Sequence, residues 1–167
     1  MRIVRSNRDM DYKDLSHEDF DAVVTGELTH YALWFENQIM NIITDYFLGS
    51  SSKRSDFKRL ILLRDGLTFQ DKIEVVYAML SLLGKKAELV NLQSILKRVE
   101  DFKSWRNALA HGLDVSTDDT KPEISIEIVS RSGKEKTVHI TPESHEQTLD
   151  EAQKLLVELQ KARKGLR

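Results

Sequence analysis

Three side chains that can bind a phosphate and move a proton lie within one short segment: Arg106, Asn107 and His111. Histidine suits proton transfer because its unperturbed pKa lies near neutrality. Arginine suits a phosphate because its planar guanidinium stays charged and donates two parallel hydrogen bonds. RNA can be cut without a metal when its 2′-hydroxyl attacks the adjacent phosphate. That reaction needs an acceptor for the 2′ proton, a donor for the leaving 5′ oxygen and positive charge on the phosphorane.

These residues end a helix that the sequence predicts over about residues 87–110. Arg106 occupies a position on the apolar line of that helix, where a buried guanidinium needs a partner or a functional reason. Asn107 and His111 are an i, i+4 pair on one face. Gly112 follows, and glycine can take the left-handed conformation that closes a helix C-terminus. The apolar line consists of Leu92, Ile95, Val99, Phe102 and Leu109.

The segment Arg106-Asn107-Ala108-Leu109-Ala110-His111 resembles the R-N-x-x-x-H signature of HEPN domains, which are small all-helical proteins. The likeness covers most of the chain from about Ser16 onward, because the predicted order of helices also looks like a variant of that arrangement. Many HEPN proteins are metal-independent RNases, often the toxin of a toxin–antitoxin pair. The resemblance therefore implies an endoribonuclease that acts on RNA, with an antitoxin protein as a candidate partner.

The resemblance also implies a homodimer. One motif supplies one histidine although two proton transfers are needed, and HEPN nucleases place their active cleft between two protomers. A two-fold dimer would duplicate the site residues. Trp34, Ile43 and Phe47 widen the apolar stripe of the first helix, which we interpret as core with some dimer contact. Leu113 stands where one HEPN subgroup has a tyrosine that a nucleotidyltransferase modifies, so that form of control is not expected.

In this hypothesis Arg106 holds the scissile phosphate, His111 transfers protons and Asn107 supports one or both. Two alternatives remain open. Arg106 can instead pair with an acid on the first helix, such as Glu36, while His111 caps the helix C-terminus. The chain would then be a non-catalytic HEPN-like helical module that binds a partner protein or a nucleotide, or a dimerisation scaffold built on the first helix.

Four basic residues form a weaker candidate for guiding the RNA backbone: Lys53, Arg54, Lys58 and Arg59. A solvated surface is the alternative interpretation. The C-terminal segment Lys161–Arg167 is basic as well. Elsewhere, His17 is expected to be solvated at a helix start, and His30 to be a core or interface residue. His139 falls on a hairpin and His145 in the first turn of the last helix.

The elements that position these residues predict a mainly α fold, an up-down helical bundle of about five helices. Residues 1–15 are expected to be a flexible N-terminal arm and residues 16–164 a single domain. The first helix runs from Ser16 to near Gly49. Apolar residues alternate at Ile124, Ile126 and Ile128, which predicts a β-hairpin over about residues 123–140, before the last helix. Thr141 and Pro142 start that last helix.

Composition excludes several classes. The 167 residues contain no cysteine, so disulfides and thiolate metal sites are excluded, and the net charge of −2 does not indicate a general nucleic-acid binder. No apolar run reaches the roughly 18–20 residues that span a bilayer, and the N-terminus lacks an apolar signal segment. No H-x-x-x-H or nucleotide-binding motif is present. We expect a cytoplasmic protein without membrane association, metal or cofactor.

Overall fold

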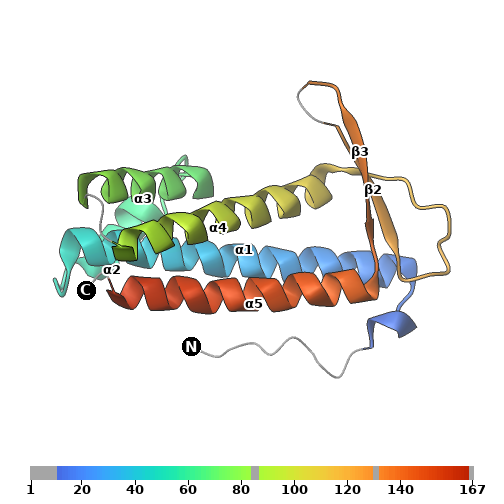
Figure 1. Cartoon of the computed structure of the whole chain (residues 1–167), viewed down its shortest axis with the longest axis horizontal. Helices are drawn as coiled ribbons and strands as arrows, with labels where there is room; N and C mark the ends of the chain where they lie inside the picture. Colours follow the sequence, from blue (N-terminus) through green and yellow to red (C-terminus); the bar gives the residue numbers. More distant parts are fainter. Residues whose placement is uncertain (1–10, 84–86, 130–131, 166–167) are drawn as a thin grey trace. The chain divides into compact units, whose positions relative to one another are not determined.

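The structure, a computed structural model, describes residues 11–83, 87–129 and 132–165 (Figure 1). The chain is 71% helical, with a small antiparallel sheet before the last helix, which confirms the predicted fold class. The elements are η1 Tyr12–Asp14, α1 His17–Leu48, α2 Arg54–Phe57, the π-helical turn η2 Lys58–Leu62, α3 Phe69–Leu83, α4 Ala87–His111, β1 Leu113–Asp114, β2 Ile124–Val129, β3 Glu135–Ile140 and α5 Pro142–Gly165.

The chain divides into two compact units. The sheet unit comprises the described residues of Met1–Tyr31 and Ser104–Glu151, and the helical unit those of Ala32–Lys103 and Ala152–Arg167. Helices α1, α4 and α5 are each divided between the two units. The single domain expected over residues 16–164 remains a prediction.

Helix α1 begins where the sequence predicts, because Ser16 caps it. The Ser16 hydroxyl accepts from the Asp19 amide at 3.1 Å and donates to the Asp19 carboxylate at 2.9 Å. The helix ends at Gly49, whose φ of 50° is one that residues with a Cβ rarely adopt. The expected apolar line is buried from Phe20 as far as Ile42.

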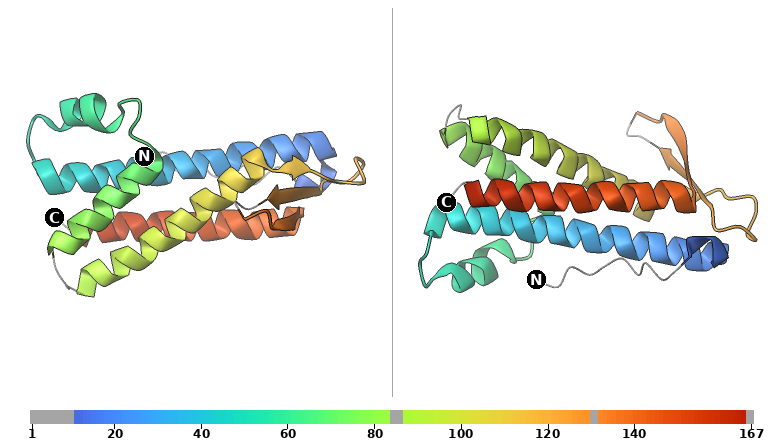
Figure 2. Two further views of the ribbon diagram at one scale, coloured as in Figure 1. Left: turned by 90° about the horizontal axis from the view of Figure 1, so that it is seen from above. Right: turned by 60° about the horizontal axis from the view of Figure 1, so that its bottom comes forward.

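The helical unit is a bundle of four long segments. Within this unit, the C-terminal half of α5 lies alongside the C-terminal half of α1, and Arg163 pairs with Asp45 there (Figure 1, Figure 2). Phe35 of α1 meets Phe102 of α4 edge to face, with ring centroids 5.1 Å apart. Buried Lys72 of α3 pairs with Glu36 of α1. The buried side chains of this unit include Ile39, Ile42, Ile43, Ile73, Val76, Leu92, Ile95, Val99, Leu156 and Leu159.

The short second helix does not continue regularly. After Phe57 the chain makes a π-helical turn that buries Leu62. The other apolar residues of this segment are exposed by 50–62%: Leu60, Ile61 and Leu63. The extra residue per turn rotates the following side chains away from the face that an α-helix would bury.

The predicted hairpin is present as β2 and β3, with Ile124 opposite Ile140. Its inward face carries buried Ile124, Ile126 and Ile140. A third strand, β1, was not predicted, because two residues are too few to show a period-two pattern. It pairs with β2 through Leu113 and Asp114 directly after the motif helix.

Part of the expected N-terminal arm is anchored. Residues 1–10 lie outside the described residues. Tyr12 is buried in η1, and its hydroxyl donates to the Glu27 carboxylate at 3.0 Å. Burial and the neighbouring Glu27 raise the pKa of Tyr12 well above its usual range. Residues 11–14 are thus fastened to α1 inside the sheet unit through Tyr12 and Glu27.

Candidate functional site

Arg106 lies in the sheet unit, in the penultimate turn of α4, and is half-buried. Its Nη1 donates to Asn107 Oδ1 at 2.9 Å. Its Nε is enclosed and has no hydrogen-bond partner among the described residues. A buried donor without a partner costs free energy, so it calls for a functional or structural reason.

No carboxylate of the sheet unit's described residues forms an ion pair with Arg106. The acid that the sequence offers as its structural partner, Glu36, accepts from Lys72 instead. The guanidinium is thus oriented by the amide oxygen of Asn107 and not by a carboxylate of this unit's described residues. A phosphate group can supply the negative charge that the described side chains of this unit do not provide to Arg106.

His111 is the last residue of α4, and its side chain is exposed. Asn107, one turn earlier on the same helix face, is also exposed. Among the residues that the structure describes, His111 makes no hydrogen bond or ion pair. The structure therefore joins Arg106 to Asn107 directly and leaves the His111 side chain accessible from solvent.

Gly112 does not take the expected left-handed conformation. Among the described residues, the glycines with positive φ are Gly49, Gly66 and Gly133. A different constraint explains Gly112. A Cβ at this position would lie 2.1 Å from Ile126 Cγ2 and 2.8 Å from the Ala108 carbonyl oxygen. The end of α4 therefore rests directly against β2, which fixes the backbone that carries His111.

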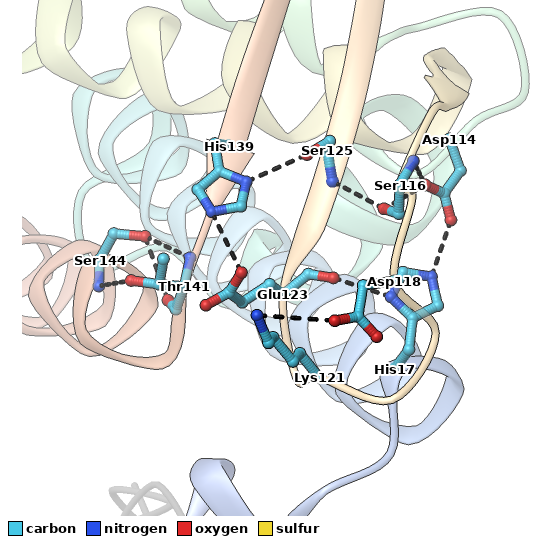
Figure 3. A network of polar contacts seen from close by, with 10 residues as sticks. All are labelled: His17, Asp114, Ser116, Asp118, Lys121, Glu123, Ser125, His139, Thr141 and Ser144. Atoms are coloured by element: carbon cyan, nitrogen blue, oxygen red, sulfur yellow. Dashed lines mark hydrogen bonds and ion pairs between the residues drawn. The ribbon is translucent and has the colours of Figure 1, made fainter.

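A polar network secures the strand that follows the motif (Figure 3). Asp114 of β1 accepts from the Ser116 amide at 2.9 Å and from His17 Nε2 at 2.9 Å. His17 Nδ1 lies 2.7 Å from the carbonyl oxygen of Glu123. Both acceptors lack protons, so this geometry favours the imidazolium form of His17, with a proton on each nitrogen.

The pKa values of this pair follow from the contacts. The hydrogen bond to Asp114 raises the pKa of His17 against the opposing effect of burial. The Ser116 hydroxyl, chiefly, lowers the pKa of Asp114. The sequence places His17 in solvent, but its side chain is only 14% exposed. No local pattern could reveal this contact, because its partners are about a hundred residues away in the chain.

A second histidine joins a serine and a carboxylate on the hairpin (Figure 3). Ser125 Oγ lies 3.0 Å from His139 Nδ1, and His139 Nε2 lies 3.5 Å from a Glu123 oxygen. Such an order of groups can activate a hydroxyl. Here His139 is 53% exposed and is the direct cross-strand partner of Ser125. The exposure favours a pair that stabilises the hairpin rather than a nucleophile, which needs a water-excluded site.

His145 is buried and has a structural role. Its side chain is 1% exposed, and its Nε2 lies 2.8 Å from Glu27. Its ring meets those of Tyr12 and Phe20 edge to face. His30, which the sequence places in a core or an interface, is exposed within the described chain.

The four basic residues belong to the helical unit and differ in environment. Lys53 and Arg59 are exposed. Arg54 pairs with the carboxylate of Asp45, and Lys58 donates to the amide oxygen of Asn41. The interpretation as a solvated surface therefore fits Lys53 and Arg59 but not Arg54 and Lys58.

Comparison with protein-family models, with curated proteins and with solved structures finds no match to this chain. Within the described ranges, no group of three or more His, Cys, Asp or Glu side chains could hold a metal ion. No helix of the described residues is long and apolar enough to cross a membrane.

Proposed function

We propose that the chain is a HEPN-like, metal-independent endoribonuclease that cleaves RNA by attack of the 2′-hydroxyl on the adjacent phosphate. One observation carries the proposal. Among the described residues, the half-buried guanidinium of Arg106 has one hydrogen bond, to the neutral Asn107 amide, and no carboxylate of its unit pairs with it. A structural arginine at this depth is normally matched by a carboxylate, because an uncompensated buried charge is costly.

In the proposed reaction, the 2′ oxygen forms a bond to phosphorus as the bond to the 5′ oxygen breaks. Arg106 holds the non-bridging phosphate oxygens and stabilises the charge that builds up on the phosphorane. Neutral His111 accepts the 2′ proton, and a second, protonated histidine gives a proton to the leaving 5′ oxygen. Asn107 keeps the guanidinium oriented through the hydrogen bond from Arg106 Nη1.

A homodimer would supply the second histidine. His17 cannot take that role, because both of its ring nitrogens are engaged by Asp114 and Glu123. His145 is enclosed. We assign the proton donor to His111 of a second copy, because a two-fold axis would bring in a second copy of every site residue. A mass by light scattering that stays monomeric at micromolar protein, with full activity, would refute the shared site.

The function is tested by incubating mixed cellular RNA with the purified protein in excess EDTA, beside Arg106→Ala and His111→Ala. We expect cutting by the parent and a loss of roughly 10²–10³ in rate for each variant. Equal activity in all three would remove the motif from catalysis. If the chain is a toxin, its overexpression should also arrest growth, and His111→Ala should relieve the arrest.

A second candidate is a non-catalytic helical module that binds a partner protein, such as an antitoxin. It is favoured by one observation, the exposure of Leu60, Ile61 and Leu63 next to each other after α2. Neighbouring exposed apolar side chains often mark a protein-binding surface. Under this alternative, substitution of all three by serine abolishes capture of the partner, while Arg106→Ala leaves it intact.

A further inference from the structure

Two arginines of the helical unit share one carboxylate, and a lysine lies nearby along the chain. The Asp45 side chain, on α1, is only 6% exposed. It pairs with Arg54 of α2 and with Arg163 of α5, whose Nε lies 2.7 Å from Asp45 Oδ2. Lys58, one turn after Arg54, donates its ammonium to the amide oxygen of Asn41. We call Arg54, Lys58 and Arg163 the cation cluster.

Among the described residues, Asp45 is the one carboxylate that pairs with the cation cluster. Arg54, Lys58 and Arg163 contribute three positive charges and Asp45 one negative, an excess of two. Burial lowers the pKa of Lys58, and the nearby Arg163 and Arg54 lower it further. The Arg54 and Arg163 side chains remain 27% and 21% exposed, so an anion from solvent can reach them. Such an anion would relieve the repulsion among the three cations.

We call the aromatic residues that follow Asp45 and Arg54 along the chain, Tyr46, Phe47 and Phe57, the aromatic border of the cation cluster. Tyr46 and Phe47 directly follow Asp45 on α1 and are 39% and 56% exposed. Their rings meet edge to face at 5.0 Å, and the ring of Phe47 lies 6.3 Å from that of Phe57. Phe57 in turn lies one turn after Arg54 and directly before Lys58. Exposed rings beside cations are the combination that binds single-stranded nucleic acid, because phosphates pair with the cations and bases stack on the rings.

We propose that the cation cluster and its aromatic border bind a single-stranded segment of RNA. Arg54, Lys58 and Arg163 contact consecutive phosphates, and a base stacks on the exposed ring of Phe47. Asp45 has a positioning role, since it holds both guanidiniums in place. The identity of the polymer as RNA rests on the proposed function. The binding itself does not, because it involves neither Arg106 nor His111.

The test is fluorescence anisotropy of a labelled single-stranded oligoribonucleotide. The probe is about ten nucleotides long, which is enough to cover one such site. All proteins carry His111→Ala, so that the probe is not cut. We expect Phe47→Ala to weaken binding by about tenfold, as loss of one stacked base does. We expect Lys58→Ala to weaken binding and to lower the slope of log affinity against log salt by about 0.7.

Two matched controls separate these effects from changes in fold. Leu82→Ala removes another exposed apolar side chain of the helical unit, 80% exposed. Lys97→Ala removes a cation whose side chain is 69% exposed. Both controls should bind like the parent. Equal affinity of Phe47→Ala and Leu82→Ala, equal binding of a duplex of the same length, or binding of anionic lipid vesicles in place of RNA would overturn the proposal. So would absence of binding by protein with an unchanged circular dichroism spectrum.

The two proposals fail separately. RNA cleavage that depends on Arg106, with unaltered binding by Phe47→Ala and Lys58→Ala, would remove the cluster and leave the nuclease. Binding that responds to both variants, without any cleavage by the parent, would leave a single-stranded RNA-binding protein and remove the nuclease.

Discussion

Arg106 donates through Nη1 to Asn107 Oδ1 at 2.9 Å, so the residue that orients the guanidinium is its own neighbour on α4. The partner is an uncharged amide, which fixes the direction of the arginine without neutralising it. This relationship distinguishes the site from an ordinary ion pair, in which the carboxylate would compete with a bound phosphate.

Asn107→Asp should convert this arrangement into an ion pair. The new carboxylate occupies the acceptor position of Asn107 and neutralises Arg106, so we expect RNA cleavage to fall by roughly 10²-fold while the fold is retained. Asn107→Ser, which adds no charge, should cost much less. Cleavage rates of the two variants decide the point, and equal rates would contradict the role given to the amide.

Arg106→Ala should cost little stability. No carboxylate of its unit is left unpaired, so the free energy of unfolding should change by less than about 1 kcal/mol. Lys72→Ala is the contrasting variant, because it leaves Glu36 without its ammonium partner and should cost about 2–3 kcal/mol. Urea unfolding measures both. A loss for Arg106→Ala as large as that for Lys72→Ala would instead support a structural arginine.

Gly112→Ala should destabilise the sheet unit, because its Cβ would lie 2.1 Å from Ile126 Cγ2. We expect a cost of about 1–3 kcal/mol, as for other overpacked sites. Gly26→Ala is the matched control, since its Cβ meets nothing within 4 Å and alanine favours α1. Thermal unfolding of both variants tests this, and a double variant with Ile126→Ala should lose less than the sum of the two single costs.

The pair of His17 and Asp114 should make stability depend on pH. The pKa of His17 is raised in the folded state, so its contribution is fully present below the unfolded pKa of about 6.5 and is lost as pH rises through the folded pKa. The pKa of Asp114 is lowered, so its contribution is lost as pH falls through that lower value. His17→Gln should therefore destabilise the protein more at about pH 5.5 than at about pH 9.

Unfolding of His17→Gln and of the parent across this range measures the effect. His139→Gln serves as the control because His139 is largely exposed on the hairpin. A His17→Gln penalty that stays constant over the whole range would show that His17 acts as a neutral hydrogen-bond donor only.

Helix boundaries were predictable from sequence because local signals set them. Ser16, Thr68 and Thr141 each accept from the backbone amide three residues later, as their positions before apolar periods indicate. The hairpin was predictable for the same reason, from its alternating isoleucines. Strand β1 was not, since its two residues are too few to show an alternating pattern and its partner β2 lies beyond a loop in the sequence.

The site was predictable only in its local part. Arg106, Asn107 and His111 share one helix end, so spacing alone placed them together. Contacts made across the chain were beyond any such pattern. Glu36 pairs with Lys72, and Asp45 pairs with Arg54, whereas Lys53, next to Arg54 in the sequence, is exposed. Which cations of a basic segment form ion pairs depends on the carboxylates of the neighbouring helix. The periodicity of the segment's own sequence does not contain this information.

The most direct test of the central claim is the chemistry of the RNA ends. Parent protein, Arg106→Ala and His111→Ala are each incubated in excess EDTA with an oligoribonucleotide, and with one in which 2′-deoxy sugars replace the ribose. We predict that the parent alone cuts the ribose form and leaves 2′,3′-cyclic phosphate ends, with the deoxy form intact. Cleavage of the deoxy form, or cyclic ends produced equally by His111→Ala, would contradict catalysis by this motif.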